Sequence, residues 1–161
     1  MKNLILYGTT YGCTESCAKT LAQKLKEPTD CKNVKEAAGI DLNLYDTLIL
    51  GSPVYMGQMN KALKAWVTEH TQTLQQKRLA FFICCGFPEM AQQHLEMNMP
   101  KPLVDRVIAK ECFGGEMDIS KMSFLHRFIT KMVTKDAEKK GKQAPRIIPE
   151  NIDRFAQAIN H

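Results

Sequence analysis

Three strongly apolar runs, each ending in glycine or in a loop of small residues, constrain the fold of this chain more than any other feature. They are KNLILYG at residues 2–8, DTLILGSPVY at 46–55 and RLAFFICCG at 78–86. Strands that are apolar on both faces are typical of a parallel sheet that helices cover on both sides. Because helical patterns alternate with these runs along the chain, the sequence predicts a doubly wound α/β fold.

Weaker patterns complete the expected order of elements. DCKNV at residues 30–34 and CFGGEMD at 112–118 are expected as the second and fifth strands. Apolar residues at helical spacing predict the helices. These helices are expected from Thr14 to the stop at Pro28, after the capping residue Asn60, and at residues 101–110, 123–134 and 150–160.

Length and cysteine content bound the class of protein. A chain of 161 residues, 44% hydrophobic and 24% charged, fits one domain, expected over 1–161. No apolar run approaches the roughly 20 residues of a membrane helix, and residues 1–8 lack the layout of a signal peptide, so a cytoplasmic location is expected. Reduced thiols are expected for the six cysteines, which show no paired C-x-x-C spacing, so no metal site is predicted. The cysteines are Cys13, Cys17, Cys31, Cys84, Cys85 and Cys112.

The positive charge is concentrated near the C-terminus. The whole chain carries +5, whereas residues 121–146 contain eight Lys or Arg and two acids, a local charge of +6. Residues 123–134 predict an amphipathic helix, and a polar, mobile connection is expected over 135–149. Such a basic segment suits an acidic partner or an anionic surface. Contact with the inner face of a membrane through 121–146 is therefore one interpretation, and a solvated loop is the other.

The loop TTYGCT at residues 9–14 follows the first strand and leads into a helix. Free peptide N–H groups at a helix N-terminus favour a phosphate, Thr9, Thr10 and Thr14 carry hydroxyl donors, and Gly12 allows close approach of the backbone. An ordinary helix cap is the alternative interpretation of this loop. Because ligands of open parallel sheets bind beyond the carboxyl ends of the strands, the loops after the first, third and fourth strands are the candidate site.

Other phosphate-binding chemistries need residues that the loop lacks. A Walker loop requires Gly-Lys-Ser/Thr, but Cys13 and Thr14 follow Gly12. The dinucleotide fingerprint G-x-G-x-x-G is missing, no basic fork surrounds Cys13 as a cysteine phosphatase requires, and no aspartate that could accept a phosphate ends the first or third strand. The remaining candidate ligand is a monophosphate that the loop holds without reacting with it.

Three segments together resemble the flavodoxin family in order and separation. They are TTYGCTESCAKTLA, YDTLILGSPVYMGQMNKALKAWV and FFICCGFPEM. The resemblance covers most of the chain and implies a flavodoxin-like three-layer α/β/α sandwich, with a five-stranded parallel sheet of order 2-1-3-4-5. It also implies FMN as the cofactor, with its phosphate in the first loop and its ring between the other two. No catalytic side chain is expected, because the flavin supplies the chemistry.

The resemblance assigns the candidate FMN residues loop by loop. Those for the phosphate are Thr9, Thr10, Tyr11, Gly12, Cys13 and Thr14. Those of the second loop are Pro53, Val54, Tyr55, Met56, Gly57 and Gln58, and those of the third are Cys85, Gly86, Phe87, Pro88 and Glu89. The family likeness further implies that the Gly57–Gln58 peptide can turn its carbonyl toward N5–H of a reduced flavin.

Two features depart from ordinary flavodoxins, which are acidic carriers. This chain is basic, and ECFGGEMDISKMSFLHRFITKMVTKDAEKKGK resembles the flavodoxin-type menaquinone-dependent protoporphyrinogen dehydrogenases. Proteins of that type carry a long basic insertion after the fourth strand, whereas residues 86–102 are short and nearly free of basic residues. The likeness therefore implies the fold and FMN, but not the porphyrin substrate.

Three functions stay open at this point. The first is an oxidoreductase that passes electrons through the exposed flavin edge to or from a quinone or small molecule, including a porphyrinogen. The second is a carrier between redox proteins, and the third is a phosphate-binding module without redox activity. No nucleic-acid partner is expected, and the oligomeric state is left open.

Two sets of side chains also allow a structural interpretation. Cys13 and Cys17 lie one helical turn apart beside a helix N-terminus, so they are either a redox pair or small packing residues, of which packing is the commoner use. Cys84 and Cys85 are expected to pack at the end of a buried strand. Among the histidines, His126 is singled out because it precedes Arg127 near the expected open edge of the flavin.

Overall fold

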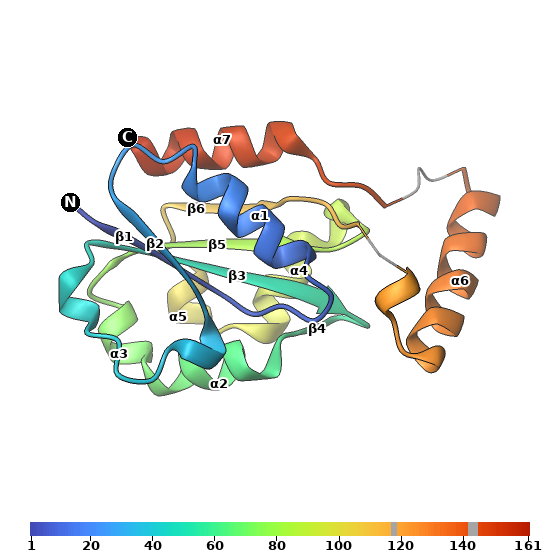
Figure 1. Ribbon diagram of the computed structural model, residues 1–161, viewed down its shortest axis with the longest axis horizontal. Coiled ribbons are helices and arrows are strands. Elements are labelled where there is room, and N and C mark those ends of the chain that lie inside the picture. The colour runs from blue at the N-terminus through green and yellow to red at the C-terminus, as the bar shows by residue number, and fades with distance from the viewer. Residues whose placement is uncertain (117–118, 142–144) are drawn as a thin grey trace.

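A computed structural model describes residues 1–116, 119–141 and 145–161. Its centre is a parallel sheet in which the strands follow the order β2-β1-β3-β5-β6, and the short β4 pairs antiparallel with β3 (Figure 1). The strands are β1 (Asn3–Tyr7), β2 (Thr29–Asn33), β3 (Thr47–Tyr55), β4 (Gln58–Met59), β5 (Arg78–Cys84) and β6 (Ala109–Cys112). Counted without β4, this is the predicted order 2-1-3-4-5, so the predicted fold is confirmed.

Helices cover both faces of the sheet and make the three layers visible in Figure 1. On one face lie α1 (Cys13–Ala22) and α7 (Pro149–Asn160). On the other lie α2 (Lys61–Glu69), α3 (Thr71–Leu74), α4 (Ala91–Asn98) and α5 (Lys101–Val104). The sixth helix, α6 (Phe124–Lys139), belongs to neither layer and stands beyond the carboxyl ends of the strands.

The alternation of side chains along the central strands builds one core on each face. Leu4, Leu6, Leu48 and Leu50 face α2 and its neighbours, whereas Ile5 and Ile49 face α1 and α7. Burial on both faces explains why β1, β3 and β5 are apolar throughout. At about 25 cal/mol per Å² of apolar surface, this burial is the main stabilising contribution to the fold.

The fifth strand was predicted at the wrong position. The structure places β6 at Ala109–Cys112, where it pairs with Ala80–Ile83 of β5. The helix predicted over residues 101–110 is also shorter than expected, since α5 ends at Val104. Because β6 lies at the edge of the sheet, its polar residues stay partly exposed and its sequence lacks the apolar signal of a central strand. Of the predicted strand 112–118, residues 117–118 lie outside the described residues.

The basic helix is longer than predicted. It continues five residues beyond 134 to Lys139, because KDAEK consists mostly of good helix formers and Asp136 pairs with Lys140 one turn later, at 2.7 Å. Of the connection predicted as mobile, residues 142–144 lie outside the described residues. Beyond them the chain is fixed to the sheet, since Ile148 N–H donates to Phe113 O at 2.8 Å.

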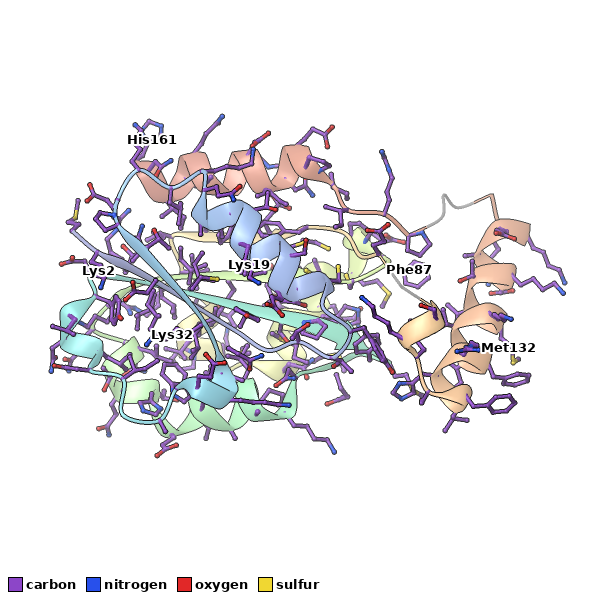
Figure 2. All side chains as sticks on the ribbon, viewed as in Figure 1. Lys2, Lys19, Lys32, Phe87, Met132 and His161 are labelled. Carbon is purple, nitrogen blue, oxygen red and sulfur yellow. The ribbon has the colours of Figure 1, made fainter. Side chains whose placement is uncertain are left out.

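The apolar side chains of α6 contact little of the body. Phe124, Leu125, Phe128 and Met132 are 57–86% exposed, and Figure 2 shows Met132 on this helix. The predicted amphipathic character is present, but the described part of the chain leaves this apolar face uncovered. None of the helices in the described residues has the length and apolar content needed to cross a bilayer.

Candidate functional site

Three loops leave the sheet at the same edge. Gly8, which begins loop 1 (residues 8–12), donates its N–H to Gly51 O of β3 at 2.9 Å, and Pro53 of β3 pairs with Cys84 at the end of β5. Loop 2 (residues 53–58) and loop 3 (residues 85–89) therefore start beside loop 1. Parallel pairing thus brings together the three segments that the sequence analysis proposed as the site.

Loop 1 presents peptide donors at the start of α1. Gly12 precedes the helix with φ 91°, and a Cβ there would meet no atom within 4 Å, so the space above it is open. The Thr9 hydroxyl accepts the Gly12 N–H at 3.0 Å and keeps its own hydrogen to donate. In the part of the chain that the structure describes, no side chain caps the first turn of α1. Its free N–H groups and the positive end of the helix dipole therefore favour an anion at this position.

Thr14 supplies the clearest sign of a ligand-binding position. Its side chain is 1% exposed, yet its Oγ1 has no hydrogen-bond partner among the described residues. A buried hydroxyl without a partner costs about 1–3 kcal/mol, so such groups in native proteins usually meet water or a ligand. The orphaned hydroxyl lies in the first turn of α1, beside the free N–H groups, and this fits a bound phosphate oxygen.

A pocket of about 330 Å³ opens between loops 1 and 2. Thr10 lines it from loop 1, and Pro53, Tyr55 and Gln58 line it from loop 2. Residues 59–62 close it, and among them the exposed Lys61 adds a positive charge that loop 1 itself lacks. Lys61 was not predicted as a site residue, although its place directly after the predicted helix cap Asn60 is a signal that it lies near the loop.

Three rings meet at the mouth of this pocket. Tyr11 and Tyr55 contact edge to face with 5.6 Å between their centroids, and His126 of α6 lies nearly parallel to Tyr55 at 6.3 Å. The Tyr11 hydroxyl is hydrogen-bonded to His126 Nδ1 at 2.5 Å. Burial, followed by the nearby Tyr11 and Cys13, raises the pKa of Tyr55 and keeps its hydroxyl protonated at neutral pH. His126 was singled out from the sequence, and the structure places it at the site.

Loop 2 is a tight hairpin between β3 and β4. Met56 and Gly57 both have positive φ, at 50° and 75°, which is the geometry of a type I′ turn. The buried Asn98 of α4 holds this turn, since its Nδ2 donates to Gly57 O at 2.8 Å and its Oδ1 accepts the Met59 N–H at 3.1 Å. Asn98 thus fixes the carbonyl that the family resemblance singled out. The sequence carried no sign of this role, because α4 was not predicted.

Two residues of loop 3 face different surroundings: Cys85 packs in the interior, whereas Phe87 lies against α6. Cys85 is buried and its Sγ lies 3.4 Å from that of Cys112, so only its backbone can reach a ligand at the sheet edge. Phe87 is half-buried and lines a second cavity of about 170 Å³ together with Val133 and Ala137 of α6 and its C-cap residue Lys140. Figure 2 labels Phe87. Loops 1 and 2 therefore share one pocket, and the Phe87 side chain lines another.

The arrangement fits a ligand that has a phosphate at one end and a flat aromatic group at the other. Neutral donors and a helix end suit a phosphate that is held and not transferred. Tyr55 and its neighbours supply apolar surface and peptide groups for a ring. These observations agree with FMN, whose chemical groups match both parts of the site.

Two of the curated relatives match this chain over different lengths. The protoporphyrinogen IX dehydrogenase (quinone) of Escherichia coli strain K12 is 25% identical over 173 residues, which cover 100% of this chain and 96% of that protein. The flavodoxin-like domain-containing protein BilS of Clostridioides difficile strain CD3 is 33% identical over 91 residues, 55% of this chain and 49% of its own length.

Solved structures and a family model agree on the fold. A flavodoxin from Streptococcus pneumonia TIGR4 gives a TM-score of 0.54 at 14% identity, covering 99% of this chain and 97% of that one. A flavoprotein from Lactobacillus acidophilus NCFM, solved in complex with FMN, gives 0.53 at 19% identity, with 69% and 92% covered. The model of the flavodoxin domain matches residues 4–144. Because this match spans most of the sequence, the chain belongs to the flavodoxin domain family.

Proposed function

We propose that this protein is an FMN-binding oxidoreductase that exchanges electrons through the exposed edge of the flavin. The observation that carries the proposal is the buried Thr14 hydroxyl, which has no partner among the described residues and lies beside the N-terminus of α1. The flavodoxin fold and the FMN-bound relative from Lactobacillus acidophilus support the same cofactor.

The three loops share the work of binding. The peptide N–H groups in the first turn of α1 and the hydroxyls of Thr9, Thr10 and Thr14 hold the phosphate, and Lys61 supplies a counter-charge. Tyr55 and Met56 with the rest of 53–58 lie against the ring, and residues 85–89 offer backbone groups on its other side. When bound, FMN supplies the transfer of electrons or hydride. The protein's own residues bind it, orient it and limit its contact with water.

The second substrate is inferred from α6 and from the relatives. The curated relative from Escherichia coli is named for protoporphyrinogen IX and quinone, and its match covers this whole chain. The exposed apolar residues of α6 stand among five Lys or Arg of the same helix: Arg127, Lys131, Lys135, Lys139 and Lys140, with the last at its C-cap. Such a helix suits an apolar, anionic substrate or an anionic membrane surface at which a quinone is dissolved. We therefore infer a quinone acceptor and a porphyrinogen-type donor.

The visible spectrum of the full chain tests the cofactor. The metal-free protein is purified, incubated with excess FMN, freed of unbound flavin and reduced stepwise without oxygen. Flavin absorbance that stays with the protein at one equivalent is the expected result. Protein that neither retains nor takes up FMN would contradict the proposal and leave only a phosphate-binding module.

Turnover assays then separate the enzyme from a carrier. The FMN-loaded protein is mixed with protoporphyrinogen and a menaquinone analogue, or with a reduced nicotinamide in place of the porphyrinogen. Oxidation of a small donor coupled to quinone reduction supports the proposal. Electron exchange with redox proteins alone would instead assign the chain as a flavodoxin-type carrier.

A further inference from the structure

Three cysteines from two distant segments meet beneath loop 1. Cys13 and Cys17 lie in the first turns of α1, and Cys84 is the last residue of β5. Their three sulfur atoms all lie within 4.8 Å of one another. Cys17 and Cys84 are 1% and 5% exposed, whereas Cys13 is partly exposed and gives the group an opening. We propose that Cys13, Cys17 and Cys84 form a three-sulfur binding site for a soft monovalent metal ion of the Cu(I) class.

The spacing of the sulfurs fits one ion at their centre. A metal–thiolate bond is about 2.3 Å long, so three sulfurs in a plane around one ion lie about 4 Å apart. All three separations between the sulfurs are at most 4.8 Å, which is compatible with this value. Cys13 and Cys17 are four residues apart on one helix face, and Cys84 closes the triangle from the strand.

The number and kind of ligands select the ion. Thiolate sulfur prefers Cu(I), zinc and iron–sulfur clusters over oxygen-seeking cations. Structural zinc and iron–sulfur clusters take four protein ligands in almost every case. Among the described residues, no fourth histidine, cysteine or carboxylate joins the three sulfurs. Cu(I) is satisfied by two or three thiolates, so this ligand set suits it best.

The position of Cys13 favours a thiolate ligand. Cys13 is the first residue of α1, so its sulfur lies close to the positive end of the helix dipole. Cu(I) takes the place of the proton on each thiol that it binds, so filling the site releases the thiol protons to the solvent.

The site lies on the inner side of the proposed phosphate loop. The Cys13 sulfur points toward Cys84, whereas the peptide N–H groups of the same turn lie at the α1 N-terminus, where the phosphate is proposed. An ion held by these sulfurs would tie the start of α1 to the end of β5. The inference does not rest on the flavin function, and its test uses no flavin, so the two proposals can fail separately.

The test is an anaerobic titration of the reduced, metal-free full chain with Cu(I) in the presence of a chromophoric Cu(I) chelator. We expect the protein to withdraw one equivalent from the chelator and to unfold at a higher temperature as free Cu(I) rises, because a ligand that binds only the folded state stabilises it. Chelator that keeps all its copper, or uptake without a thermal shift, would overturn the proposal. A tighter site for Zn²⁺ than for Cu(I), measured in the same way, would overturn the choice of ion.

Single variants decide whether these three sulfurs hold the ion. Cys17→Ala and Cys84→Ala should each weaken Cu(I) binding by at least about 100-fold. Loss of a group that only hydrogen-bonds a metal ligand already costs up to about 100-fold, and loss of a ligand itself should cost no less. Cys31→Ser on β2 is the matched control and should bind as the wild type does. Cys112→Ser tests the rival pair Cys85–Cys112, whose sulfurs lie 3.4 Å apart. If Cu(I) binding is lost in Cys112→Ser or Cys31→Ser but is kept in Cys17→Ala, the assignment is overturned.

Circular dichroism of each variant without metal guards against a folding defect. Cys17→Ala lies in a helix, where alanine is the best helix former, so this variant is expected to fold. Cys13→Ser, at the partly exposed position, is the second test of the same triangle. Loss of Cu(I) binding in two folded variants, with both controls unchanged, is the result that supports the site.

Discussion

Threonine and glycine residues, without a basic residue among them, make up the part of loop 1 and of the first turn of α1 that is proposed to bind a phosphate. The structure gives each a separate role: Thr9 braces Gly12, Gly12 turns the chain at positive φ, and Thr14 leaves its buried hydroxyl free. A phosphate that is only held needs donors more than charge, since hydrogen bonds to an ionised group contribute about 1.5–3 kcal/mol each. The lack of a lysine within the loop is therefore consistent with anchoring a cofactor.

Thr14→Val tests this role at a single atom. Valine keeps the shape of the side chain and removes the hydroxyl, so we expect FMN affinity to fall by about 10- to 100-fold, as for loss of one hydrogen bond to a charged group. Stability without FMN should change by less than about 1 kcal/mol or rise, because the hydroxyl has no partner among the residues that the structure describes. Fluorescence titration with FMN and urea unfolding measure the two effects.

The control for this change is Thr68→Val on the exposed side of α2. The Thr68 hydroxyl donates to Lys64 O at 2.9 Å and lies outside the proposed site. Its loss should leave FMN affinity unchanged. Equal affinity in Thr14→Val and the wild type would remove the main support for a phosphate in loop 1.

The hairpin formed by β3 and β4 depends on α4 for its position. Asn98, 9% exposed, bridges the Gly57 carbonyl and the Met59 N–H. Asn98→Ala leaves the buried Met59 N–H without an acceptor, so the free energy of unfolding should fall by about 1–3 kcal/mol. Faster hydrogen exchange at Met59 should accompany the loss. The matched control is Asn43→Ala, at an exposed residue, for which we expect almost no change in the free energy of unfolding. If Asn98→Ala is as stable as the wild type and its Met59 amide stays protected from exchange, this role is refuted.

The contact between β2 and the start of β1 makes stability depend on pH. Lys2 Nζ lies 2.8 Å from Asp30 and the Tyr45 hydroxyl donates to the same oxygen at 2.5 Å, and together they lower the pKa of Asp30. The ionised carboxylate is favoured in the folded state, so its contribution is present above the ordinary carboxyl pKa and is lost as pH falls through the lowered one.

Asp30→Asn measures that contribution. At pH 7 the free energy of unfolding should fall by at most about 1 kcal/mol, because both charged groups are about a third exposed and solvent weakens their attraction. The difference from the wild type should shrink as the pH falls toward 3. Urea unfolding at several pH values tests this. The control is Asp105→Asn, which removes the exposed ion pair between Lys101 of α5 and its C-cap residue Asp105. A difference that grows with acid would contradict the assignment.

Two elements show where local sequence patterns fail. The strand β6 was misplaced because a partly exposed edge strand lacks the continuous apolar run that marks β1, β3 and β5. The helix α4 was missed because among its eight residues only Leu95 and Asn98 are buried, so no apolar stripe is visible. By contrast, α7 carries four buried residues at helical spacing, Ile152, Phe155, Ala156 and Ile159, and its predicted core face is correct.

At the scale of the whole molecule, α6 places a basic and apolar surface beyond the edge of the sheet (Figure 1). Vesicles that contain phosphatidylglycerol should bind the protein at low salt and release it as salt rises, since each Lys or Arg near an anionic surface contributes about 1 kcal/mol. The double variant Phe124→Ser and Phe128→Ser should weaken sedimentation with vesicles by more than about tenfold.

The control variant replaces two exposed apolar residues that lie outside α6. Leu44 and Met97 are 62% and 64% exposed and lie outside α6. Their replacement by serine should leave vesicle binding unchanged. If the control loses as much binding as the α6 variant, or if salt has no effect, the membrane role of α6 is wrong.

The sequence by itself determined the α/β class, the central strands and the three candidate loops. These features follow from local signals, because burial on both faces makes a strand apolar and a turn into a helix requires small residues. Tertiary structure alone decided which distant side chains meet. Tyr11, Tyr55 and His126 come together, as do Cys13 and Cys84, because parallel pairing brings segments far apart in the chain to one edge of the sheet. No local pattern encodes such contacts, since each depends on the packing of the whole fold.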